Sequence, residues 1–93
     1  MQETAVEREG RYIVSILREN GFERDAESLG AELGKLTDPL LALSALETII
    51  SMCHVKWLGD KNIKTVSDYT EWWGSLGRLS KAASKAKRKI SPV

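Results

Sequence analysis

The stretch from Pro39 to Val55 contains a single charged residue, Glu47, although charged residues make up 29% of the chain. Apolar residues recur in it at spacings of three and four on two sides of a helix, so both sides must meet neighbouring helices. These residues are Leu40, Leu43, Leu46, Ile50 and Cys53 on one side, and Leu41, Ala45, Ile49 and Met52 on the other. The pattern predicts a buried third helix at the centre of an all-α fold. Its predicted start is Asp38-Pro39, where aspartate caps amide groups and proline takes the first helical position.

Three further amphipathic helices are predicted, within residues 3–20, at about 24–36, and from Ser67-Asp68 towards the basic end of the chain. Gly21 is expected to end the first of these in a left-handed cap, with Phe22 folded back onto the helix end. Their apolar stripes are Val6, Gly10, Ile13, Val14 and Leu17; Ala26, Leu29, Gly30, Leu33 and Leu36; and Tyr69, Trp72, Trp73, Leu76, Leu79, Ala83 and Ala86. Because only the connection at 55–66 is long, the expected fold is a compact up-and-down bundle of about four helices.

A chain of 93 residues is long enough for one domain, 1–93, with one modest core. Its lone cysteine, Cys53, has no partner for an internal disulfide, which is typical of a cytoplasmic protein. The start, Met1 to Thr4, is polar and acidic, without the basic and apolar regions of a secretory signal. No apolar run approaches the length of a membrane span. We therefore expect a cytoplasmic protein that does not engage a membrane.

Charge is unevenly distributed along the chain. Residues 1–47 carry ten acids and five bases, whereas residues 48–93 carry three acids and nine bases. Five bases crowd the last thirteen residues, namely Lys81, Lys85, Lys87, Arg88 and Lys89. We expect a basic, partly frayed tail at 81–93, whose charges favour a helix C-terminus and keep the tail solvated. The alternative interpretation is that the same residues bind phosphate groups.

No constellation for catalysis or metal binding is present in the sequence. Cys53 and His54 are adjacent, so on a helix their side chains point about 100° apart and cannot pair directly. Cys53 is interpreted as a small buried residue, and His54 as a group that bonds free carbonyls at the helix end. Gly74 and Gly77 lie inside a helical stripe, where they are expected to let a neighbouring helix approach. We predict no catalytic residue, no cofactor and no metal, and therefore no enzyme.

Two aromatic segments allow a packing and a binding interpretation. The segment Trp57-Leu58-Gly59-Asp60 has two interpretations. It is either a tight turn fixed by Asp60, with Trp57 and Leu58 packed into the bundle, or a recognition loop. The projecting residues of such a loop would be His54, Lys56, Trp57, Asp60 and Lys61. Trp72 and Trp73 are neighbours, so one is expected in the core and the other near its edge, where tryptophan often anchors an interface.

The size, the helix count, the acidic first half and the corner Cys53-His54-Val55-Lys56-Trp57-Leu58-Gly59-Asp60 together resemble the small all-α immunity proteins of bacterial contact-dependent inhibition and other polymorphic toxin systems. This resemblance implies a toxin domain as partner, often a nuclease, whose basic cleft acidic residues would occlude. A basic cleft would steer an acidic patch towards itself and then be blocked without chemistry by the inhibitor. The candidate partner-binding residues are Glu19, Glu23, Asp25, Glu27 and Glu32, followed by Trp57, Asp60 and Trp72.

Two other functions compete with this one. The first is a small nucleic-acid-binding or regulatory accessory protein that uses the basic tail. The acidic first half of the chain would repel a duplex, and the tail has no aromatic residue for stacking on bases. The second is a helical module that associates with itself through an exposed tryptophan edge.

Overall fold

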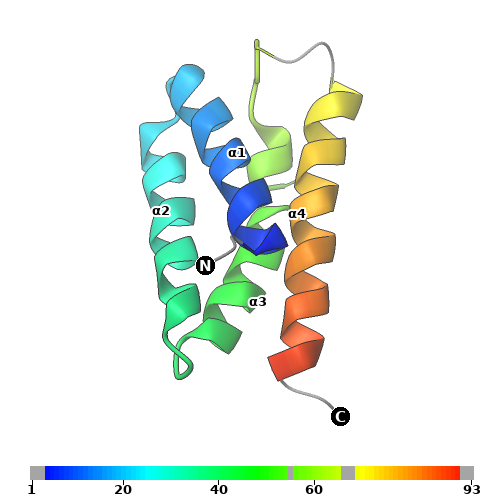
Figure 1. Ribbon diagram of the computed structural model, residues 1–93. Helices are drawn as coiled ribbons and strands as arrows, with labels where there is room; N and C mark the ends of the chain where they lie inside the picture. Colours follow the sequence, from blue (N-terminus) through cyan, green and yellow to red (C-terminus); the bar gives the residue numbers. More distant parts are fainter. Residues whose placement is uncertain (1–3, 55, 66–68, 91–93) are drawn as a thin grey trace.

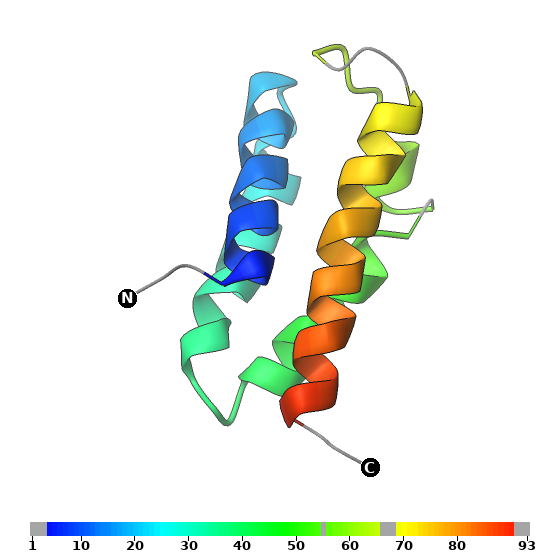
Figure 2. The ribbon, with the colours of Figure 1, turned by 45° about the vertical axis from the view of Figure 1, so that its right-hand side comes forward.

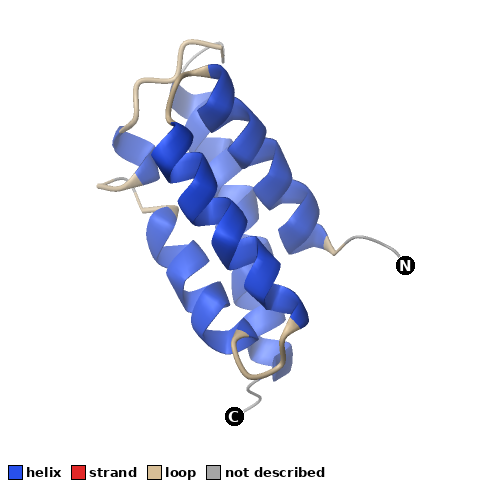
Figure 3. Cartoon of the chain, turned by 90° about the vertical axis from the view of Figure 1, so that its left-hand side faces the viewer, coloured by secondary structure: helices blue, strands red, loops and turns tan. Residues whose placement is uncertain are grey.

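Four α-helices make up the described part of the chain, residues 4–54, 56–65 and 69–90, in this computed structural model (Figure 1). They are α1 (Ala5–Glu19), α2 (Glu23–Gly34), α3 (Ala42–Met52) and α4 (Tyr69–Ile90), with short 3₁₀ helices η1 (Lys35–Thr37) and η2 (Leu58–Asp60). Successive helices run alternately up and down the bundle, and the described residues contain no strand (Figures 1 and 3). The prediction of an all-α bundle of about four helices is confirmed.

Both ends of α1 follow from local sequence chemistry. Thr4 and Glu7 form a capping box, in which each side chain bonds the other residue's backbone amide. At the other end Gly21 has φ of 82°, the left-handed conformation predicted for it. The Phe22 amide then donates to the Leu17 carbonyl over 2.8 Å, which completes a Schellman motif. Phe22 is half-buried against the core, as expected.

The start of α3 differs from the prediction by a few residues. The Asp38 carboxylate accepts a hydrogen bond from the Leu40 amide over 2.9 Å, and its carbonyl accepts one from the Ala42 amide over 2.9 Å. Asp38 therefore satisfies free amides as predicted, but residues 39–41 form a turn and α3 begins only at Ala42. Leu40 lies in this turn and is 91% exposed, so its place in the predicted core stripe is wrong.

The helices form a ring, so α3 lies at a corner and not at the centre. Extensive contacts join α1 to α2, α2 to α3, α3 to α4 and α4 back to α1. The sequence had suggested a central helix because α3 has apolar residues on two sides. Those two sides meet α4 and α2, and the third side, with Ser44, Glu47 and Ser51, is exposed. The core between the helices contains Ile13, Leu17, Leu29, Leu46, Ile49, Met52, Leu58, Trp72, Leu76, Leu79 and Ala83 among others.

The basic segment belongs to the bundle as far as Ile90. Residues 81–90 continue α4, and Ala83 is fully buried, so this stretch is not the frayed tail that was expected. Residues 91–93, like the predicted helix start at Ser67-Asp68, lie outside the described residues. None of the described helices has the length and the apolar character needed to cross a membrane.

Close helix approach occurs at a different glycine from those predicted. Gly74 and Gly77 are exposed, and a Cβ atom on Gly77 would meet nothing within 4 Å. A Cβ on the buried Gly10 would instead lie 2.6 Å from Leu33 Cδ2. Gly10 therefore brings α1 and α2 together, whereas the glycines of α4 face solvent.

One helix of the ring is much shorter than its neighbour. α1 has 15 residues and α4 has 22, so at about 1.5 Å per residue α1 is shorter by about 10 Å. The two helices are level at the end where α4 begins, and α4 extends beyond the start of α1 at the other end (Figures 1 and 2). That second end of the bundle is therefore built by α2, η1, α3 and α4.

Candidate functional site

Two adjacent indole groups hold the connection between α3 and α4 against the start of α4. Trp72 Nε1 donates to the Leu58 carbonyl over 2.9 Å, and Trp73 Nε1 donates to the Gly59 carbonyl over 3.0 Å. Leu58 is fully buried, so it plugs the bundle as the packing interpretation predicted. Both carbonyls belong to η2, and the corner is thereby fixed on the rigid part of the fold.

The turn itself is closed by His54 and not by Asp60. The His54 carbonyl accepts hydrogen bonds from the amides of Trp57 (3.0 Å) and Gly59 (3.2 Å), and its ring Nδ1 accepts one from the Lys56 amide (3.1 Å). Asp60 is exposed, and no hydrogen bond of its carboxylate is found within the described residues. The predicted role of Asp60 in fixing the turn is therefore wrong, and its carboxylate faces solvent at this corner. Val55 lies outside the described residues.

Three aromatic residues at this corner are exposed, namely Trp57, Tyr69 and Trp73, and we call them the aromatic corner. Trp72 is fully buried, so its selection as a partner-binding residue is wrong. Trp57 is 43% exposed and does not plug the bundle, while Trp73 is 49% exposed at the edge of the core. The rings of Trp73 and Tyr69 are in contact, with centroids 5.6 Å apart and planes tilted by 36°. The sequence had left open which of Trp72 and Trp73 lies at the edge of the core, and it had placed Tyr69 in the core stripe.

The five predicted acidic residues do not form one patch. Positions 23 and 27 of α2 are one turn apart and share a side, whereas positions 25 and 32 lie on the other side of the helix, at about 140–200° from position 23 or 27. Three of the five are engaged in ion pairs: Glu23 with Arg18 (3.8 Å), Asp25 with Lys61 (3.3 Å) and Glu32 with Lys35 (3.1 Å). Glu19 ends α1, while Glu23 and Glu27 lie on one side of the first turns of α2, so these three residues flank the turn between the two helices. We call these three residues the acidic edge.

Asn20 joins the turn between α1 and α2 to the connection 56–65 that precedes α4. Its side-chain Nδ2 donates to the Ile16 carbonyl over 2.8 Å and to Thr65 Oγ1 over 3.0 Å, and its Oδ1 accepts from the Lys64 amide over 2.7 Å. The nearby ion pair of Lys61 with Asp25 makes a second link between these segments, and the Lys61 ammonium lies 5.5 Å from the centre of the Phe22 ring. Residues about 45 positions apart therefore share one end of the bundle.

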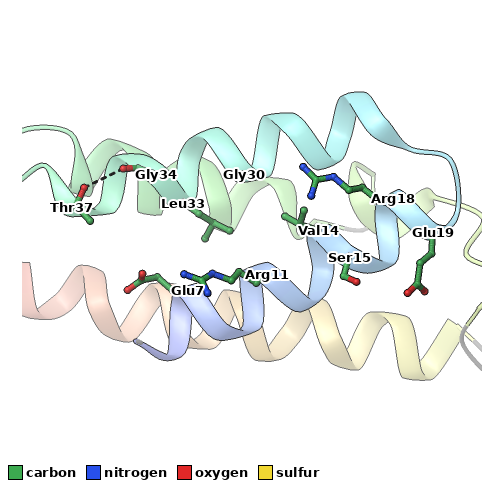
Figure 4. A pocket seen from close by; sticks show the side chains of 10 residues that line it. All are labelled: Glu7, Arg11, Val14, Ser15, Arg18, Glu19, Gly30, Leu33, Gly34 and Thr37. Atoms are coloured by element: carbon green, nitrogen blue, oxygen red, sulfur yellow. Dashed lines mark hydrogen bonds between the residues drawn. The ribbon is translucent and has the colours of Figure 1, made fainter. Parts of the chain in front are cut away.

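A groove of about 620 Å³, lined by charged and apolar residues, runs between α1 and α2 next to the acidic edge (Figure 4). It exists partly because Gly30 and Gly34 carry no side chains, and a Cβ on either would meet nothing within 4 Å. Glu7, Arg11 and Arg18 reach into the space between the helices (Figure 4). The lining residues are Glu7, Arg11, Val14, Ser15, Arg18, Glu19, Gly30, Leu33, Gly34 and Thr37. Both signs of charge are present, so the groove suits polar side chains of a partner better than a single ion.

Cys53 and His54 do not form a reactive pair. Burial raises the pKa of the Cys53 thiol to about 12, so the thiol is protonated at neutral pH and is a poor nucleophile. His54 is exposed and its Nδ1 is used by the turn. Among the described residues, no three of His, Cys, Asp and Glu are grouped so that they could hold a metal ion.

Comparison of the chain with protein-family models gives no match, and neither do comparisons with curated proteins and with solved structures. The function is therefore inferred from the geometry of the chain's own residues.

Proposed function

We propose that this chain is a non-catalytic binding protein, and specifically an immunity protein that binds a cognate bacterial toxin, such as a nuclease, and occludes its active-site cleft. One observation supports the proposal: Asn20 bonds Lys64 and Thr65, so the turn that carries the acidic edge is held against the connection 56–65, which contains Trp57 and Asp60. The contact surface of the proposal consists of Glu19, Glu23, Glu27, Trp57, Asp60, Tyr69 and Trp73.

The two halves of this surface serve different steps of binding. Half-exposed aromatic side chains on a rigid support lose little entropy on binding and often dominate interface energies. Carboxylates around them speed association with a basic cleft and favour it over acidic partners. Steric occlusion requires no chemical reaction by the inhibitor. This agrees with a site in which His54 closes a turn and the Cys53 thiol is protonated by burial.

The proposal is tested with the toxin domain encoded next to this chain's gene. We expect one-to-one binding in isothermal titration calorimetry, loss of the toxin's activity on binding, and survival of cells that express both proteins. An adjacent gene product that neither binds the chain nor harms cells lacking it would contradict the immunity role.

Charge reversal on the acidic edge gives the sharper test. The double substitution Glu23→Lys and Glu27→Lys is expected to slow association at least tenfold at low salt. Glu47→Lys on α3 is the control, because Glu47 is an exposed residue outside this surface whose ion pair with Lys87 spans 3.6 Å. Trp73→Ala is expected to raise the dissociation rate, since it removes an anchor and not a steering charge. Unchanged association after the double reversal would remove the acidic edge from the interface.

The second candidate function is nucleic-acid binding through α4. Lys81, Lys85, Arg88 and Lys89 fall within about 100° of the helix circumference, whereas Lys87 points elsewhere and pairs with Glu47 over 3.6 Å. A one-sided basic stripe of this kind would grip phosphates in a salt-dependent way. Removing residues 81–93 would also remove the buried Ala83, so Lys81→Glu with Arg88→Glu is the better variant. Absence of DNA and RNA binding by the unmodified chain at low salt would exclude this function.

A further inference from the structure

At the end of the bundle opposite the aromatic corner, no helix of the described residues occupies the position beyond the start of α1. Because α1 begins about 10 Å short of the end of α4, a groove of about 450 Å³ opens between α4, η1 and α3 below the first turn of α1. Figures 1 and 2 show this region, in which α3 lies behind the space that continues the line of α1. The groove therefore lies where about two further turns of α1 would lie if that helix were as long as α4.

The floor of this groove is apolar. Its apolar residues come from α1, η1, α3 and α4, and they are Val6, Leu36, Ala42, Leu46, Ala82, Ala86 and Ile90. Ile90 is 47% exposed, and Leu40 and Leu41, just before α3, are 91% and 45% exposed. Apolar surface thus extends beyond the groove at this end, which is the kind of surface that the apolar face of a helix covers.

The rim of the groove is positively charged along α4. Lys85 and Lys89 line it one turn apart, and no ion pair of either is found within the described residues. The one acidic residue of the lining, Glu7, already accepts hydrogen bonds from the amide and the hydroxyl of Thr4. An occupant with carboxylates at i and i+4 would therefore meet two free ammonium groups on α4.

We propose that this groove docks a short amphipathic helix of a partner protein, with leucine-like residues on one face and acidic residues on the edge that meets α4. Such a helix continues the line of α1 and completes the ring, so its apolar side replaces water over the floor described above. Lys85 and Lys89 select acidic helices and exclude basic ones. This surface is distinct from the aromatic corner at the other end and independent of it.

The test uses a synthetic, end-capped peptide of about 14 residues, a length at which a helix is marginal alone and can fold on binding. It carries leucines at i, i+3, i+4 and i+7 and glutamates at i, i+4 spacing along one edge. The matched peptide has lysines in place of the glutamates. In titrations followed by NMR of the full chain, the glutamate peptide is expected to shift the amides of Leu46, Ala82 and Ala86, and the lysine peptide to bind at least tenfold more weakly.

Two variants make the assignment specific. Lys85→Glu with Lys89→Glu is expected to weaken the glutamate peptide about tenfold and to strengthen the lysine peptide. The control Lys56→Glu with Lys64→Glu changes the net charge equally at exposed positions of the opposite end and should change neither affinity by more than twofold. Ala86→Trp, which fills the groove, is expected to abolish binding while the circular dichroism spectrum stays helical.

Several outcomes would overturn the proposal. They are equal binding of the two peptides, amide shifts confined to the aromatic corner or to the groove between α1 and α2, and binding that survives Ala86→Trp. Concentration-dependent dimerisation that Ala86→Trp abolishes would also overturn it, because a second copy of this chain would then be the occupant. Absence of any shift at millimolar peptide would exclude a helix-binding groove.

Discussion

The indole nitrogen of Trp72 donates a hydrogen bond to the carbonyl of Leu58 across 2.9 Å, and both residues are fully buried. This bond satisfies the indole N–H within the core, where it would be costly without a partner, while the Leu58 carbonyl also accepts from the Lys61 amide over 3.2 Å. It also explains why a connection with little regular structure has a fixed position relative to the bundle.

Substitution of the two tryptophans by phenylalanine should have unequal effects. Trp72→Phe removes the indole donor, so that the Leu58 carbonyl keeps only the Lys61 amide at 3.2 Å, and it creates a cavity in the core; we expect the free energy of unfolding to fall by about 2–4 kcal/mol. Trp73→Phe removes the bond to Gly59 at a half-exposed site, and a loss of about 0.5–1.5 kcal/mol is expected. Urea denaturation followed by circular dichroism measures both. Equal losses would mean that the buried bond contributes no more than the exposed one.

Asn20→Ala should loosen the connection 56–65 from the turn between α1 and α2. The substitution removes the bonds to the Ile16 carbonyl, Thr65 and the Lys64 amide, for which we expect a loss of about 1–3 kcal/mol. Amide hydrogen exchange should rise at Lys64, whose amide loses its acceptor. Asn62→Ala, at an exposed site of the same connection, is the control and should leave stability within about 0.5 kcal/mol. If both variants behave alike, Asn20 is not the link between the two segments.

Two glycine substitutions should change stability in opposite directions. Gly77→Ala places a methyl group in open space on α4 and is expected to raise the free energy of unfolding by about 0.5–1 kcal/mol. Gly10→Ala forces Leu33 to move and should lower it by about 1–2 kcal/mol. In a Leu33→Ala background the space is available, so Gly10→Ala should become neutral or favourable. A double-mutant cycle without coupling between positions 10 and 33 would contradict the close approach of α1 and α2.

The thiol of Cys53 should make the protein less stable in alkali. Burial raises its pKa from the ordinary 9.0 to about 12, so between these values the folded state keeps a proton that the unfolded chain releases. The contribution of this difference to the free energy of unfolding is fully present below pH 9. Between pH 9 and about 12 it falls by about 1.4 kcal/mol per pH unit. Between pH 8 and pH 10 the protein should therefore lose about 1.4 kcal/mol more than its Cys53→Ala variant. Parallel pH dependence of the two proteins in urea denaturation would show that the thiol is not desolvated.

The helices were predictable from the sequence because their determinants are local. Periodic apolar residues define α1, α2 and α4, and Gly21 adopts the left-handed conformation that its place after the last apolar residue indicated. The position of α3 was not predictable in this way. Apolar residues on two sides of a helix are equally compatible with a centre and with a corner, and only the packing of α1 against α4 decides between them.

The candidate site was predicted less well, since it depends on contacts distant in the sequence. The sequence predicted that one of Trp72 and Trp73 lies in the core and the other near its edge, which is confirmed, but which of the two is buried depends on where η2 meets α4. The acidic residues were grouped by closeness in sequence, but helix geometry separates Asp25 and Glu32 from Glu23 and Glu27. A helical wheel of α2 would have shown that separation; nothing in the sequence indicated that Asn20 reaches Thr65.

The contact of α1 with α4 has a consequence for how the chain folds. Every other extensive helix contact of the described bundle joins neighbours in sequence, which form quickly because little chain must be organised to bring them together. Joining the first helix to the last closes a loop of most of the chain, so the rate-limiting barrier should include this step. Weakening the ion pair of Glu9 with Arg78, which spans that contact at 3.5 Å, would then slow refolding more than it accelerates unfolding.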